Sequence, residues 1–141
     1  MEMATFSALL SWAVLLSGYA EPQGPPELEY KPHTFFVSEA CGGDECEAIG
    51  WYNDAHVVYL DERMRGDNRS DTRSLVVHEL VHYLQHLSGK YDSLSCADQI
   101  AREREAYAIQ RIYMAEAHGQ PQFQQMRPPL CDADYEGVSG P

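Results

Sequence analysis

Apolar residues near the middle of the chain recur at intervals that predict a long, buried helix. This helix is expected over residues 71–88, with Asp71 as its N-cap and Gly89 as its C-terminal stop. Its apolar residues occupy much of the helix circumference: Leu75, Val76, Leu80, Tyr83, Leu84 and Leu87. A helix that is apolar around most of its surface is expected to lie in the core.

A second helix is predicted over residues 95–118, and Gly119 and Pro121 follow as its stop signals. Its apolar positions are Ile100, Tyr107, Ile109, Ile112 and Tyr113. Two short runs earlier in the chain, 34–37 (TFFV) and 55–60 (AHVVYL), are rich in β-branched and aromatic residues and are expected to be strands. The pattern as a whole predicts an α+β fold with a short sheet and two main helices.

The first twenty residues differ from the rest of the chain. Residues 6–16 (FSALLSWAVLL) are almost entirely apolar, and Gly18 and Ala20 are small residues of the kind that precede a cleavage site. We therefore expect residues 1–20 to be a signal peptide that is cleaved before Glu21. The run is shorter than the ~20 apolar residues that cross a bilayer, so no membrane span is expected. No Lys or Arg precedes the run, and the alternative is a buried N-terminal helix.

The remaining residues, 21–141, have the length of one domain, with Pro-rich and less regular ends expected at 21–33 and 120–141. The formal net charge of the chain is -12. A surface this acidic repels phosphate backbones and anionic lipid, so we expect no nucleic-acid partner. The sequence specifies no oligomeric state.

Four cysteines are consistent with an exported chain, because disulfides persist in oxidising compartments. None of them forms a CxxC pair, which argues against a zinc site made of cysteines. Of the three possible pairings, Cys41–Cys46 and Cys96–Cys131 is preferred, since the first pair closes a Gly-rich loop (CGGDEC) and the second ties the C-terminal tail to a helix. The expected location is secreted or periplasmic.

The first predicted helix contains an HExxH motif, His78-Glu79-Leu80-Val81-His82. Two histidines at i and i+4 lie on one helix face, close enough to share a metal ion. Glu79 lies beside them, where it is placed to take a proton from a metal-activated water. No other charged residue occurs over residues 75–87, so these polar groups need a partner in the core. The alternative is a polar seam without a metal.

A catalytic zinc site needs a third protein ligand. His86 is two turns from His78, about 12 Å along the axis at 1.5 Å per residue, so both cannot bind one ion at ~2 Å. The metzincin pattern HExxHxxGxxH fails, because Gln85 and Ser88 occupy its later positions.

The remaining candidates are two carboxylates on the second helix, Glu105 and Glu103. Glu105 is preferred because small or apolar residues share its helical face, namely Ala101, Ala108, Ile109 and Ile112. Glu103, whose face includes Ile100, Tyr107 and Gln110, is kept in reserve. The alternative for either residue is an exposed glutamate paired with a neighbouring arginine.

The segments HELVHYLQ and REREAYAIQ together resemble the gluzincin type of zinc metallopeptidase, and they are similar to small exported bacterial HExxH proteins of unassigned substrate. In gluzincins a glutamate on a downstream helix, often before a small residue, completes a His, His, Glu site; here Glu105 precedes Ala106. The resemblance covers about residues 55–113 and excludes the cysteines and the Pro-rich ends. It implies a small zincin-like domain.

The resemblance also implies a function: hydrolysis of peptides by a Zn²⁺ ion held by His78, His82 and Glu105, with Glu79 as the general base. The strand at 55–60 would then border the cleft and pair with an extended peptide. Candidates for stabilising the oxyanion are Tyr107, Tyr113, Tyr91 and His118. The alternatives are a non-catalytic exported zinc-binding domain and a metal-free domain stabilised by disulfides.

Overall fold

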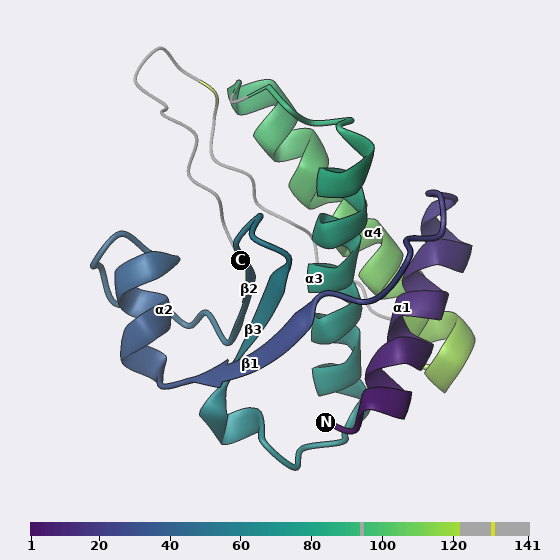
Figure 1. The fold of residues 1–141 in the computed structure, drawn as a ribbon, viewed down its shortest axis with the longest axis horizontal. Coiled ribbons are helices and arrows are strands. Elements are labelled where there is room, and N and C mark those ends of the chain that lie inside the picture. Colours follow the sequence, from purple (N-terminus) through teal and green to yellow (C-terminus); the bar gives the residue numbers. More distant parts are fainter. Residues whose placement is uncertain (94, 122–130, 132–141) are drawn as a thin grey trace.

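The computed structural model describes residues 1–93, 95–121 and 131 of the chain. Its elements follow in the order α1 (Met3–Ser17), β1 (Glu27–Lys31), α2 (His33–Glu39), β2 (Gly50–Tyr52), β3 (Val57–Asp61), the 3₁₀ turn η1 (Glu62–Met64), α3 (Ser70–Ser88) and α4 (Cys96–His118). The protein is a small α+β domain, as predicted. Figure 1 shows the sheet between α2 on one side and α3 with α1 and α4 on the other.

The two main helices lie close to their predicted positions. Helix α3 begins one residue earlier than expected, with Arg69 rather than Asp71 at the N-cap, and Asp71 lies in the first turn, where its charge suits the helix dipole. Gly89 ends α3 in the left-handed conformation at φ 73°. The side chain of Ser95 caps α4 by accepting a hydrogen bond from the Asp98 N–H, and Gly119 ends it.

The sheet has the order β1-β3-β2, so β3 is its central strand. The predicted strand at 55–60 corresponds to β3, which pairs with β1 in parallel and with β2 in antiparallel register. Both of its edges are therefore occupied, and the expectation that this strand pairs with an extended peptide is corrected. Strands β1 and β2 are the two edge strands of the sheet, and β2, the one beside α3, has outer backbone groups that no strand of this sheet pairs with.

The predicted strand at 34–37 is wrong, because these residues belong to helix α2. Periodicity cannot separate a strand from a helix in so short an apolar run. A helix places Phe36 and Ala40 on one face, where both are buried, while the Phe35 ring packs on the sheet 4.7 Å from that of Tyr59. Pro32 at the N-cap suits the start of a helix because it has no N–H to leave unbonded.

The apolar N-terminal run forms α1, which packs against α3 and α4. Its buried residues are Phe6, Leu9, Leu10 and Ala13. Trp12 meets the ring of Tyr113 edge-on at 5.7 Å between centroids. The packing of α1 agrees with the alternative interpretation, a buried N-terminal helix. Cleavage of a signal peptide before Glu21 stays a prediction. No helix in the described part of the chain combines the length and the apolar character needed to cross a membrane.

The two ends of the predicted domain are described to different extents. Within 21–33, the segment that was expected to be less regular, residues 27–31 form strand β1. At the other end, the expectation of little regular structure over 120–141 concerns 122–130 and 132–141, which lie outside the described residues.

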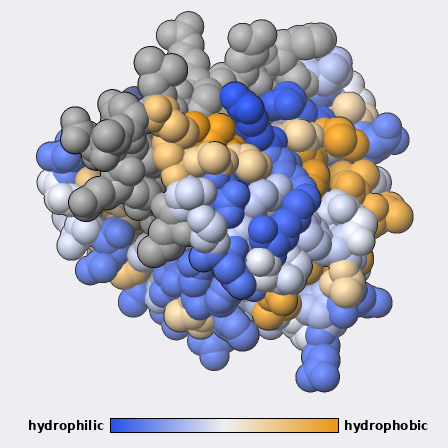
Figure 2. Space-filling model, turned by 90° about the horizontal axis from the view of Figure 1, so that it is seen from above, coloured by the Kyte–Doolittle hydropathy of each residue, from blue (hydrophilic) through white to orange (hydrophobic). Residues whose placement is uncertain are grey.

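Both preferred cysteine pairs form disulfides, Cys41–Cys46 and Cys96–Cys131. Disulfides of this kind indicate an oxidising environment outside the cytoplasm. The face of the molecule in Figure 2 is mostly polar, with apolar residues in small groups between the polar ones.

Candidate metal centre

Helices α3 and α4 bring two histidines and one glutamate together between them. In α3, Nε2 of His78 and Nε2 of His82 lie 3.2 Å apart. From α4, the carboxylate of Glu103 places Oε1 2.9 Å from Nε2 of His82 and Oε2 3.4 Å from Nε2 of His78. The ligand atoms of the three residues all lie within 4.8 Å of one another, a separation that one metal ion can bridge.

A chain of hydrogen bonds fixes the protonation of His78. The Ser74 hydroxyl donates to the backbone carbonyl of Asp71, at 2.8 Å, and accepts from the amide nitrogen of Gln110, at 3.2 Å. The amide oxygen of Gln110 therefore faces Nδ1 of His78, at 3.0 Å, and Nδ1 must carry the proton that this oxygen accepts. In the neutral ring, Nε2 then presents a lone pair to the metal position.

An equivalent arrangement orients His82. The amide nitrogen of Gln85 donates to the backbone carbonyl of Arg102, which only accepts, so the amide oxygen of Gln85 is the atom 2.7 Å from Nδ1 of His82. Nδ1 of His82 therefore carries a proton, and a neutral ring then has its lone pair on Nε2. The sequence interpretation missed both glutamines, although a histidine that binds a metal commonly donates its other N–H to an oxygen.

Three electron-pair donors thus converge on one point. Oε1 of Glu103 is buried and lies 2.9 Å from Nε2 of His82. Burial raises the pKa of Glu103, but the two histidines outweigh this and lower it to about 2, so the group is a carboxylate. Two imidazole lone pairs and a carboxylate in a buried site fit a cation, and this group could hold a metal ion.

Glu105, the preferred third ligand, lies away from the two histidines. Its carboxylate accepts hydrogen bonds from the Tyr19 hydroxyl, from the amide of Gln85 at 3.0 Å and from Lys90 at 3.0 Å. Residues two apart on a helix point in roughly opposite directions, so Glu103 and Glu105 cannot both reach the two histidines. The structure places the reserve candidate, Glu103, at the histidines.

The choice of helical face explains this difference. The face of α4 that meets α3 includes Gln99, Glu103, Ala106 and Gln110, and its polar residues gave it the pattern of an exposed face. Ile112, which was assigned to the packed face with Glu105, is 44% exposed. Gln99, Glu103 and Gln110 recur on this face at intervals of four and seven positions. This recurrence was the sequence pattern that could have identified Glu103 as the residue facing the histidines.

Glu79 is fully buried beside the two histidines. Neither of its carboxylate oxygens has a hydrogen-bond partner in the described residues, and burial raises its pKa against the opposing effect of His78 and His82. Together with His78 it lines a cavity of about 170 Å³. A buried carboxylate without a partner is unusual in a core, and this one borders a cavity from which a partner can reach it.

Residues 47–50 and Leu75 form one wall of this cavity, and Tyr107 lines it as well. The Tyr107 ring meets that of His78 at 4.5 Å between centroids. Of the four candidates for stabilising the oxyanion, Tyr107 is therefore the one beside the metal group, while Tyr113 pairs with His118 at 2.9 Å. A side chain at Gly50 would press on Leu75 at 3.3 Å, so a glycine allows β2 to approach α3 closely.

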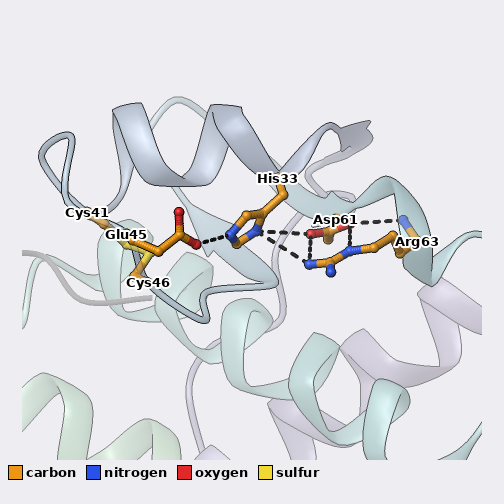
Figure 3. A network of polar contacts seen from close by, with 6 residues as sticks. All are labelled: His33, Cys41, Glu45, Cys46, Asp61 and Arg63. Atoms are coloured by element: carbon orange, nitrogen blue, oxygen red, sulfur yellow. Dashed lines mark hydrogen bonds and ion pairs between the residues drawn. A yellow bond between two sulfur atoms is a disulfide. The ribbon is translucent and has the colours of Figure 1, made fainter.

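A polar network anchors the loop that leads into this wall (Figure 3). His33 lies between Glu45, 2.9 Å from its Nε2, and the buried Asp61, 3.4 Å from its Nδ1. Arg63 holds Asp61 through contacts of 2.7 and 2.9 Å, and the Cys41–Cys46 disulfide closes the loop that carries Glu45. The start of the cavity wall, at residue 47, directly follows this anchor.

His86 lies outside the metal group, as its distance along the helix predicted. Its Nδ1 pairs with the Tyr52 hydroxyl at 2.7 Å.

Comparison of the chain with protein-family models, with curated proteins and with solved structures found no match.

Proposed function

We propose that this protein is an extracytoplasmic zinc-dependent hydrolase that acts on peptides. The observation that carries the proposal is the pair of amide contacts at His78 and His82, which leave both Nε2 lone pairs directed at the position shared with Glu103. Two imidazole nitrogens and one carboxylate, from three side chains, are a ligand set of catalytic zinc sites, whereas Mg²⁺ and Ca²⁺ prefer oxygen ligands alone.

Bound zinc supplies a Lewis acid that polarises a carbonyl and lowers the pKa of water. The chain's own residues do the rest. Glu79, buried without a partner, takes the proton from the attacking water and delivers it to the leaving amine. The cavity of about 170 Å³ beside His78 gives a substrate access to this position. Tyr107 also lines this cavity, and its hydroxyl is the proposed hydrogen-bond donor to the oxyanion. A purely structural zinc site has four protein ligands and needs no such cavity.

Peptides are proposed as substrates because the motif segments resemble gluzincins. Strand β2, at the edge of the sheet and next to the cavity, has backbone groups that suit an extended peptide. The two disulfides support a secreted or periplasmic location.

The test combines metal analysis with hydrolysis of a mixed peptide library. We expect one zinc per chain and cleavage that disappears in Glu79→Gln while the zinc content is unchanged, because this near-isosteric change removes the base and no ligand. Glu116→Gln, on the exposed surface of α4, is the matched control and should cleave like the parent. Full activity in Glu79→Gln, or a parent protein without zinc after growth in zinc-containing medium, would refute the proposal.

A further inference from the structure

A second cavity, of about 110 Å³, lies one helical turn beyond the metal group. It is bounded by the end of α3, the first turns of α4 and the loop after β2, and its lining includes Gln85, His86, Gln99 and Arg102. All of these side chains are polar, and the proposed hydrolysis uses only Gln85 among them. The exposed carboxylates Asp54 and Asp92 also line it.

Two buried polar atoms among these lining residues have no partner within the described part of the chain. Oε1 of Gln99, on a side chain that is 8% exposed, accepts no hydrogen bond, and Nε of Arg102 donates none. No carboxylate forms an ion pair with Arg102 among the described residues. Native proteins rarely leave buried donors and acceptors unsatisfied, and a buried cationic N–H favours an anionic acceptor.

The unpaired atoms of Arg102 and Gln99 define the kind of ligand that this cavity can bind. Arg102 offers a cationic N–H, which favours a carboxylate, and the acceptor on Gln99 favours an N–H group. His86 adds a ring to the cavity, and its Nδ1 is occupied by Tyr52. A carboxylate next to an amide N–H is the chemistry of the C-terminal end of a peptide.

The position of the cavity relative to the metal group fits the same ligand. Gln85 belongs to both places, since it lines the cavity and its oxygen accepts from Nδ1 of His82. It lies three residues beyond His82, about 4.5 Å along the helix axis, and Arg102 directly precedes Glu103. Because one extended residue spans about 3.5 Å, a group bound in this cavity is about one or two residues from the scissile bond.

We propose that this cavity binds the C-terminal carboxylate of a short peptide at Arg102, with the last amide N–H of the peptide donating to Oε1 of Gln99. The inference rests on the proposed function, and it makes the substrates peptides that are cleaved close to a free C-terminus. The exposed Asp54 and Asp92 repel a second carboxylate, so an acidic last residue is disfavoured.

Binding to the zinc-loaded Glu79→Gln protein tests this assignment without turnover. The probes are N-acetyl-tetra-alanine as the free acid and as the C-terminal amide, titrated by calorimetry. We expect the acid to bind at least about tenfold more tightly, since a charge-assisted hydrogen bond is lost in the amide. Adding Arg102→Gln should bring the two peptides to equal affinity, whereas Arg104→Gln, on an exposed neighbour, should keep the preference. Adding Gln99→Leu should weaken both peptides equally.

Equal affinity of acid and amide in the Glu79→Gln protein itself overturns the assignment and does not depend on how any variant at the cavity folds. An acid preference that survives Arg102→Gln overturns it as well. Failure of this assignment can be distinguished from failure of the proposed hydrolase function. Glu79-dependent cleavage without an acid preference removes only this inference, while an acid preference in a protein that cleaves no peptide removes the hydrolase and leaves a peptide-binding site.

Discussion

The amide of Gln110 provides the sharpest test of how the metal group is organised. In Gln110→Leu, Nδ1 of His78 loses the oxygen that lies 3.0 Å away. The metal-free protein can avoid this loss, because the proton can move to Nε2, which lies 3.4 Å from the carboxylate of Glu103. The metal-bound protein cannot do so, because Nε2 is then a ligand and Nδ1–H remains buried without an acceptor.

The free-energy cost of losing this hydrogen bond therefore falls almost entirely on the zinc-bound protein. Leaving a buried donor unsatisfied costs about 1–3 kcal/mol, and substitutions of such outer partners typically lower metal affinity about 10- to 100-fold. We expect a decrease of that size in zinc affinity for Gln110→Leu, measured by competition with a chelator, and a similar decrease for Gln85→Leu. Gln110→Glu should tighten binding instead, because a carboxylate is a stronger acceptor.

Gln99→Leu is the matched control. Gln99 is also a buried glutamine on α4, but its amide oxygen contacts no histidine. Its zinc affinity should equal that of the parent. If Gln110→Leu remains folded and its zinc affinity stays within about twofold of the parent, far from the 10- to 100-fold expected, the assignment of the histidine tautomers is refuted.

Three further predictions concern the third metal ligand, helix α1 and the Asp61–Arg63 pair. Glu103→Gln should weaken zinc binding by more than the roughly 100-fold limit for outer partners, whereas Glu105→Gln should weaken it less; the opposite order in a chelator competition would restore Glu105 as the ligand. Phe6→Ala in the full chain should lower the free energy of unfolding by about 3–5 kcal/mol, measured in urea, and no change would show that α1 does not pack as described. Hydrogen bonds from Arg63 lower the pKa of Asp61 below its ordinary 3.8, so its contribution to stability is present above that value and is lost as the pH falls through the lowered pKa. Unfolding midpoints below pH 4 should therefore fall more steeply for the parent than for Asp61→Asn, and parallel curves would contradict the ion pair.

The parts of the fold that local interactions decide were predictable. The helix that carries HExxH, its end at Gly89 and the Ser95 cap follow from periodicity and capping, which involve residues within a few positions of one another. The Cys41–Cys46 pair closes a short loop, so its pairing was also accessible. The helix at 33–39 was missed, because its apolar residues are too few to define a period and their burial against the sheet decides the outcome.

Local spacing alone predicts that His78, Glu79 and His82 lie together on a buried helix, because residues one and four positions apart have fixed directions around a helix. Packing between distant segments brings Glu103 to the two histidines, places Gln85 and Gln110 against their Nδ1 atoms, and puts β2 rather than β3 at an edge of the sheet. Periodicity states which residues share a face of a helix. Which face meets a neighbouring element depends on packing between segments that are distant in the chain, and no local pattern encodes it.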